Sequence, residues 1–214
     1  MSNSFTIVKG RPLLTMYCDL AENIRPWSIL ELGVFEGGSY VFLDKVFRPA
    51  KLSALDLREE PTPALLQYVQ SRDCRTLHFG ASQTDERILD RIITEDLSGR
   101  LDMVVDDASH AYDLTRRSFE LLYPRLAPGG TYIIEDWAWA HFRRSQGDGA
   151  LGATRPALTN LIFDLVQLQG STDLIAELRI CRSMAIVRKP DSSSVCPIDI
   201  FSLIQNRGKC LNQI

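Results

Sequence analysis

Adjacent carboxylates follow two apolar runs of this sequence. Residues 104–110 read VVDDASH and residues 133–136 read IIED. Buried strand ends rarely carry neighbouring acids, because an uncompensated buried charge is costly. A bound cation would remove that cost. Asp107, Glu135 and Asp136 then form an all-oxygen ligand set, which suits Mg²⁺.

Two histidines lie near these acids and are candidate general bases. His110 stands three residues after Asp107, and His141 stands five residues after Asp136. A neutral imidazole can accept a proton near neutral pH, so either residue could deprotonate a hydroxyl. His110 could equally be a metal-shell or helix-start residue, and His141 a surface residue of a loop.

A glycine-rich turn provides a candidate nucleotide site. Residues 31–38 read ELGVFEGG, where an apolar strand pattern changes to a helical one. Glycines there let the backbone approach a ligand, although such turns also end strands for structural reasons. The spacing differs from G-x-G-x-x-G, which disfavours a nicotinamide oxidoreductase.

Polar residues after the next two strand patterns extend this candidate site. Asp56 follows Gly33 by 23 residues and could accept both ribose hydroxyls of an adenosine; the alternative is a solvated acid at a strand end. Ser82 and Gln83 are weaker candidates for an adenine pocket. Their alternative role is a helix N-cap at Ser82 or Thr84.

Short apolar runs alternate with helical patterns along most of the chain. The expected strands are 28–34, 52–57, 76–79, 103–106 and 131–135, with two closing strands at 174–178 and 184–187. The expected helices are 11–23, 39–46, 63–71, 85–94, 112–126 and 156–169. This alternation predicts an α/β fold with a parallel sheet, whose carboxyl edge collects the candidate residues. Residues 137–154 are expected to form a loop on the substrate side.

Composition narrows the class of protein and of partner. The chain has 214 residues, 45% hydrophobic and 24% charged, with a formal net charge of -3 and five cysteines. We expect one domain at 1–190, with a covering helix at its N-terminal end, and a tail at 191–214. The charge disfavours nucleic acid or a membrane as partner. Odd, scattered cysteines and the absence of a signal pattern favour a cytoplasmic protein, and apolar stretches at both ends favour a homodimer.

Residues 27–137 resemble a known family. The turn ELGVFEGG resembles motif I of the class I methyltransferases that use S-adenosylmethionine (SAM). An acid, a base three residues on and an acidic pair 28 and 29 residues on resemble the metal-dependent O-methyltransferases, whose catechol-type members carry Lys where this chain has His110. The version with His and Glu-Asp is more similar to the sugar O-methyltransferases of the macrocin and mycinamicin group, and to cephalosporin hydroxylase-like proteins.

The resemblance implies a Rossmann-like fold with a seven-stranded, mostly parallel sheet and helices on both faces. It implies Mg²⁺-dependent methyl transfer from SAM to a hydroxyl of a sugar or glycoside, with a mannoside suggested by the similarly short methyltransferase of methylmannose polysaccharide synthesis. A phenolic or polyketide acceptor, and a SAM-binding protein that does not methylate, remain alternatives. The implied residues are His110 and His141 for catalysis, Asp107, Glu135 and Asp136 for the metal, and Glu31, Gly33, Gly37, Gly38, Ser39, Asp56, Ser82 and Asp106 for the cofactor.

Overall fold

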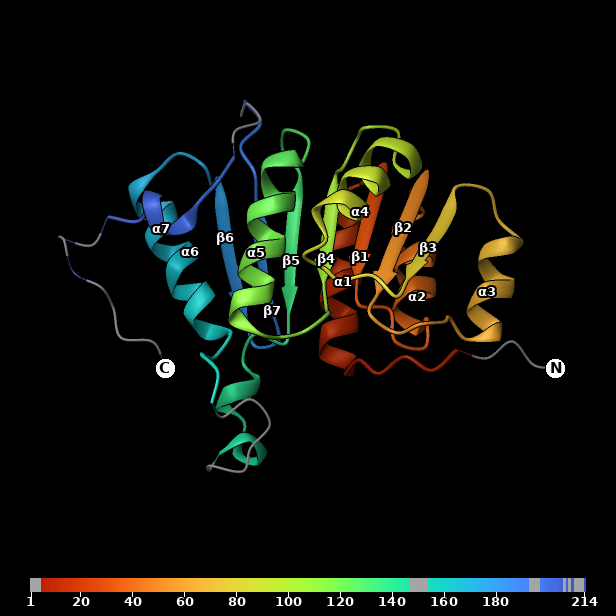
Figure 1. The fold of residues 1–214 in the computed structure, drawn as a ribbon, viewed down its shortest axis with the longest axis horizontal. Coiled ribbons are helices and arrows are strands. Elements are labelled where there is room, and N and C mark those ends of the chain that lie inside the picture. The colour runs from red at the N-terminus through yellow and green to blue at the C-terminus, as the bar shows by residue number, and fades with distance from the viewer. Residues whose placement is uncertain (1–4, 147–153, 193–196, 206, 208, 210–213) are drawn as a thin grey trace. The chain divides into compact units, whose positions relative to one another are not determined.

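A computed structural model describes residues 5–146, 154–192, 197–205, 207, 209 and 214 of the chain. The chain divides into two compact units, residues 1–108 and 109–214. Its seven strands have the order β3-β2-β1-β4-β5-β7-β6. The expected Rossmann-like class with a mostly parallel sheet is confirmed (Figure 1). No helix among the described residues is long and apolar enough to cross a membrane.

The first unit contains four parallel strands. They are β1 (Ser28–Leu32), β2 (Lys51–Asp56), β3 (Arg75–Phe79) and β4 (Met103–Asp106). β1 pairs with β2 on one side and with β4 on the other, so that Leu32 stands level with Leu55 and Asp106. The first, second and fourth strands therefore end together, and the residues that follow them lie at one edge of the sheet.

Helices separate these strands. They are α1 (Arg11–Asn23), α2 (Gly38–Phe47), α3 (Pro63–Gln70) and α4 (Glu86–Arg91), which continues as a π-helical turn, η1 (Ile92–Asp96). Thr62 caps α3 by accepting a hydrogen bond from the amide of Leu65. The N-cap of α4, considered as an alternative role for Ser82 or Thr84, is neither of these residues. Asp85 fills that role, because its carboxylate accepts from the amides of Arg87 and Ile88.

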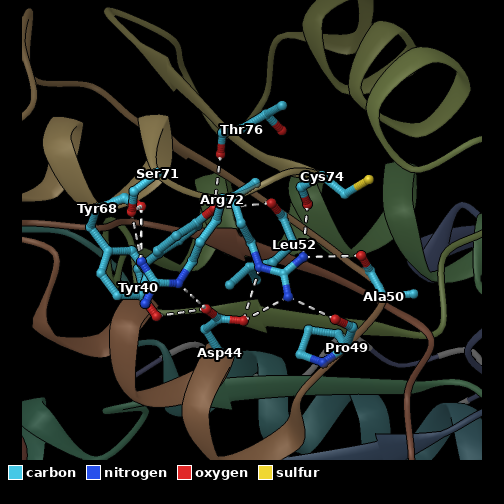
Figure 2. Close-up of polar contacts among 11 residues, drawn as sticks. Tyr40, Asp44, Pro49, Ala50, Leu52, Tyr68, Ser71, Arg72, Cys74 and Thr76 are labelled. Carbon is cyan, nitrogen blue, oxygen red and sulfur yellow. Dashed lines mark hydrogen bonds and ion pairs between the residues drawn. The ribbon is translucent and has the colours of Figure 1, made fainter.

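A buried acid joins helices to strands at the opposite edge of this unit. Asp44, near the end of α2, accepts a 2.6 Å hydrogen bond from Tyr68 of α3 and a 2.9 Å bond from Arg75 at the start of β3. Figure 2 shows the side chains of Asp44 and Tyr68 pointing toward one another. We call Asp44, Tyr68, Arg72 and Arg75 the Asp44 cluster. It connects α2, α3 and β3 at the end of the sheet away from the glycine turn.

The second unit contains the last three strands, which are antiparallel to their neighbours within it. They are β5 (Thr131–Glu135), β6 (Glu177–Cys181) and β7 (Met184–Arg188), in the order β5-β7-β6. The helices of this unit are α5 (Tyr112–Leu122), η2 (Tyr123–Arg125), η3 (Trp139–His141), η4 (Arg143–Ser145), α6 (Thr159–Ser171) and α7 (Ile200–Leu203). Buried Lys189 donates to the carbonyls of Pro124 and Leu126 and so caps η2. Burial lowers the pKa of this ammonium.

One expected strand is displaced in the sequence. The predicted strand 174–178 is wrong, because β6 runs from Glu177 to Cys181. Only Arg182 and Ser183 separate β6 from β7, and this short hairpin fixes Cys181 opposite Met184. The carbonyl of Leu174 instead accepts a hydrogen bond from the hydroxyl of Tyr123. Local apolarity predicted a strand there, but the hairpin register decided where it lies.

Part of the expected tail packs within the second unit. Asp199 caps α7, and the amide of Ile200 donates to the carboxylate of Glu120 in α5. Ile200 is buried. The part of the tail that forms α7 is therefore docked within the second unit. Residues 193–196, 206, 208 and 210–213 of the tail, and residues 147–153 of the expected substrate-side loop, lie outside the described residues.

Candidate cofactor and metal site

Asp56 holds the glycine turn in shape. One carboxylate oxygen accepts hydrogen bonds of 2.8 Å from the amides of both Val34 and Phe35, and the other accepts from the amide of Arg58 at 2.8 Å. The side chain is buried, with 8% of its residue surface exposed. Asp56 thus orders the turn through three backbone amides. Its predicted contact with ribose hydroxyls stays a prediction.

Gly33 is required by its neighbours as well as by any ligand. Its φ angle is +84°, a conformation that side-chain-bearing residues rarely adopt. A Cβ at this position would lie 2.3 Å from the carbonyl oxygen of Asp107. The amide of Asp107 in turn donates to the carbonyl of Leu32 at 2.9 Å. The glycine turn and the acidic end of β4 are therefore interlocked, and a change in one displaces the other.

The start of α2 follows this turn directly. Gly37 is its N-cap, and Gly38 and Ser39 occupy its first turn. Unpaired amides at a helix N-terminus favour a negatively charged or oxygen-bearing ligand group. The carbonyl of Thr6 lies against Gly38, since a Cβ there would come within 2.0 Å of it. The segment that precedes α1 thus crosses the beginning of α2.

The remaining predicted cofactor residues are more deeply placed. Glu31, within β1, is fully buried, and Asp106 is 2% exposed at the end of β4. The amide group of Gln83 contacts the Asp106 carboxylate at 3.3 and 3.4 Å. Ser82 contacts Thr84 in the turn before α4. Gln83 and Asp106 are therefore brought together, and the adenine contacts expected of Ser82 and Gln83 stay a prediction.

Asp107 forms an ion pair with a lysine. The ammonium of Lys9 lies 2.6 Å from Asp107 Oδ2, with side-chain exposures of 5% for Lys9 and 22% for Asp107. Lys9 belongs to the segment before α1, and nothing in the pattern of that segment predicted a partner for an acid about a hundred residues later. Sequence reasoning missed this residue.

Glu135 and Asp136 diverge at the end of β5. Glu135 is the last strand residue and is 1% exposed, with Met184 of β7 opposite it. Asp136 leaves the strand with a φ of +53°, and its amide donates to the carbonyl of Ser183 at 2.8 Å. Asp is one of the residues that tolerates this left-handed conformation. The two consecutive acids therefore differ in burial and in backbone conformation.

The two candidate bases occupy different surroundings. His110, at a φ of +51°, places its ring 4.2 Å from the ring of Trp139 in η3. His141 Nε2 lies 2.5 Å from the hydroxyl of Thr159 at the start of α6. The Thr159 hydroxyl also reaches the carbonyl of Trp137. His141 is thus tied to the helix start, whereas His110 stands beside an exposed aromatic side chain.

Two of the predicted residues in the second unit could share a metal ion. His110 and Asp136 each offer one ligand atom, and these atoms lie within 4.8 Å of each other. Asp107, at the end of the first unit, offers a carboxylate of its own. Carboxylates suit Mg²⁺, and an imidazole also suits softer divalent cations. His110 was predicted as a base, and its place beside Asp136 also makes it a candidate ligand.

Comparison with known proteins identifies the family. Residues 30–137 match the family described as a methyltransferase domain. The chain belongs to this family. The matched span runs from β1 to the residue after Asp136, so it includes the glycine turn and both acidic strand ends.

Several relatives are named sugar or macrolide O-methyltransferases. The chain is 30% identical over 151 residues to mycinamicin VI 2''-O-methyltransferase of Micromonospora griseorubida, covering 66% of this chain and 35% of that protein. It is 27% identical over 151 residues to demethylmacrocin O-methyltransferase of Streptomyces fradiae, covering 66% and 36%. The match therefore spans about a third of these relatives' lengths.

Solved structures include similar folds. MycE methyltransferase from the mycinamycin biosynthetic pathway, in complex with Mg and SAH, matches with a TM-score of 0.61 at 25% identity, covering 90% of this chain and 53% of that chain. The same protein in complex with Mg, SAH and mycinamycin VI matches with a TM-score of 0.59. The chain thus spans about half the length of MycE.

Proposed function

We propose that this protein transfers a methyl group from SAM to a hydroxyl of a sugar or glycoside, with Mg²⁺ as the metal. Its membership of the methyltransferase family supports the cofactor. The names of its relatives support a glycoside acceptor, and the contents of the MycE crystals support the metal. A mannoside is the acceptor that we propose within this class.

The observation that carries the metal-dependent form of the proposal is the Asp107 carboxylate, which directly follows β4 and is 22% exposed. Asp107 already attracts a cation, because the Lys9 ammonium lies 2.6 Å from it. Carboxylate oxygens are the ligands that Mg²⁺ prefers, and the ion leaves coordination positions for water or substrate. We therefore assign Asp107 and Asp136 as the residues that would hold Mg²⁺.

Methyl transfer is an in-line displacement. The acceptor oxygen forms a bond to the methyl carbon while the bond from that carbon to sulfur breaks, the sulfur keeping the electron pair as SAH leaves. When bound, Mg²⁺ would lower the pKa of the acceptor hydroxyl. The chain's own contribution is to order the glycine turn through Asp56, fix the carboxylates at the strand ends, and accept the hydroxyl proton on an imidazole nitrogen.

The proton acceptor is assigned to His110 in preference to His141. His141 is engaged with Thr159 at 2.5 Å, whereas His110 offers a ring nitrogen within 4.8 Å of the Asp136 carboxylate. Separate changes to Ala discriminate a base from a ligand. Loss of a base lowers turnover and leaves Mg²⁺ affinity unchanged, whereas loss of a ligand weakens Mg²⁺ binding as well.

The test is methyl transfer from isotopically labelled SAM to a panel of mannosides, other glycosides and simple phenols, with and without EDTA. We expect labelled glycoside, SAH in equal amount, and loss of at least about 90% of the rate in EDTA that added Mg²⁺ restores. If only the phenols became labelled, the acceptor would be a phenol and not a glycoside. Full activity in EDTA, or failure to bind SAM in a calorimetric titration, would refute the proposal.

A further inference from the structure

Residues Phe5–Gly10 form an extended segment that we call the N-terminal strap. Its beginning packs on α3, where the ring of Phe5 meets the ring of Tyr68 edge-on at a centroid distance of 5.6 Å. Its middle crosses the start of α2, with the carbonyl of Thr6 against Gly38. Its end delivers Lys9 to Asp107. The strap therefore crosses the glycine turn and ends on a proposed metal ligand.

The strap is held at its ends more than along its length. Val8 is 73% exposed and Ile7 is 38% exposed, so these apolar side chains contribute little burial. The Lys9 side chain, by contrast, is 5% exposed and paired with Asp107. Burying an ammonium is costly unless a partner compensates it, so the position of Lys9 depends on the charge of Asp107. A competing cation at Asp107 would remove that compensation.

We propose that Lys9 is an internal cation that occupies Asp107 until Mg²⁺ binds, and that its displacement releases the N-terminal strap from the glycine turn. The proposal rests on the metal site of the proposed function. A lysine ammonium is a compact point charge on a flexible stem, and it can be exchanged for an ion without rearranging the strand end. Lys9 thus couples Mg²⁺ binding at Asp107 to the position of the N-terminal strap over the start of α2.

Thermodynamic linkage makes this coupling measurable from both sides. If Mg²⁺ and the Lys9 ammonium compete for Asp107, removing the ammonium must tighten Mg²⁺ binding by the factor by which Mg²⁺ loosens the strap. The predicted factor is roughly tenfold, which lies within the usual range for coupling between sites. A lysine that merely stabilises the fold would not show this reciprocity.

The first measurement is a calorimetric titration of the full chain with Mg²⁺ alone. We expect Lys9→Met to bind Mg²⁺ roughly tenfold more tightly than the unchanged protein, and Lys9→Arg to stay within about twofold because the competing charge is kept. Lys45→Met removes an exposed charge of the same unit and should leave the affinity unchanged.

The second measurement uses trypsin on the unchanged protein. Among residues 1–44 the basic residues are Lys9, Arg11 and Arg25, and the two arginines precede prolines, which block trypsin. Release of residues 1–9 therefore reports only on the Lys9–Gly10 bond. The rate of cleavage follows the population of molecules in which the strap is released. Saturating Mg²⁺ should therefore accelerate cleavage about tenfold. Mass spectrometry measures the released peptide, and the reference is the same reaction in Ca²⁺-free buffer with EDTA.

The outcomes separate the two proposals. Mg²⁺ binding that is equal in Lys9→Met and the unchanged protein, with cleavage indifferent to Mg²⁺, would overturn the role of Lys9 and leave the metal site standing. Absence of Mg²⁺ binding in both proteins would overturn both. Slower cleavage in Mg²⁺ would show the strap tightening over the site, which also contradicts the proposed displacement.

Discussion

Two acid-cation pairs of the first unit differ in character. Asp44 is held by Arg75, whose Nε and Nη2 atoms lie 2.9 and 2.8 Å from Asp44 Oδ1. Tyr68 donates to Asp44 Oδ2 at 2.6 Å (Figure 2). Asp107 receives the ammonium of Lys9. Both contacts are short, so distance alone does not distinguish a structural pair from a functional one.

The surroundings of the cation make the distinction. Arg75 also donates to the carbonyls of Pro49, Ala50 and Cys74, so its rigid guanidinium is fixed from several sides. Lys9 reaches Asp107 from a strap with exposed apolar residues. An acid that is paired with a fixed arginine has a structural role. An acid that is paired with a flexible lysine can exchange that lysine for another cation.

Breaking the Asp44 cluster should give the largest loss of stability. Arg75→Met removes the guanidinium and leaves Asp44 buried without its main partner, which we expect to cost about 3–5 kcal/mol of the free energy of unfolding. Urea denaturation measures it. Arg91→Met is the matched control, because Arg91 and Glu95 form an exposed pair and its loss should cost less than about 0.5 kcal/mol. If both variants lost similar amounts of the free energy of unfolding, the Asp44 cluster would contribute no more to stability than an exposed ion pair.

Changing Asp107 should instead reduce methyl transfer strongly and the free energy of unfolding only slightly. Asp107→Asn keeps the side-chain shape but removes the charge that a cation needs, so we expect methyl transfer to fall about 100-fold, or ~2.7 kcal/mol of transition-state stabilisation. The free energy of unfolding should change by less than about 1 kcal/mol. Asp73→Asn, at an exposed acid of the same unit, is the control. A drop in stability as large as that of Arg75→Met would place Asp107 among the structural acids.

The sequence predicted most of the helices and strands, and it predicted that β1, β2 and β4 end at one edge of the sheet. Apolar runs bounded by turn residues located β1, β2, β4 and β5 closely, because strands that are buried on both faces leave a strong local signal. The position of β6 depended on a two-residue hairpin, and the cap of α4 on whether Ser82, Thr84 or Asp85 met the helix amides. Such choices between adjacent candidates are made by backbone geometry that periodicity does not encode.

Side-chain direction was the part of the site that the sequence could not provide. Glu135 and Asp136 are consecutive and were both predicted as ligands, yet Glu135 is almost fully buried, whereas Asp136 offers its carboxylate to His110 from a left-handed backbone conformation. The Asp56 carboxylate accepts hydrogen bonds from the amides of the glycine turn, which no sequence pattern predicted, and its contact with a ribose stays a prediction. Lys9 lies 98 residues from Asp107, and no spacing rule connects residues across that interval.

The smallest expected effect tests how the Asp44 cluster responds to alkali. Burial is the main reason that the pKa of Tyr68 rises to about 12, and its hydrogen bond to Asp44 adds to this. Since the folded-state pKa is raised above the ordinary value of about 10, the stability that Tyr68 contributes is present below about pH 10 and is lost as the pH rises toward 12. Tyr68→Phe should therefore cost about 1 kcal/mol at pH 7, for the lost hydrogen bond.

That difference between Tyr68→Phe and the unchanged protein should narrow between about pH 10 and 12, because only the unchanged protein loses the contribution of this hydroxyl there. Urea unfolding at a series of pH values measures it. Tyr123 is the matched control: burial also raises its pKa, but its hydroxyl donates to backbone carbonyls rather than to an acid. If the difference in the free energy of unfolding stayed constant across the alkaline range, the Tyr68 hydroxyl would not titrate within the Asp44 cluster. Arg75 would then be the partner that holds Asp44 in place.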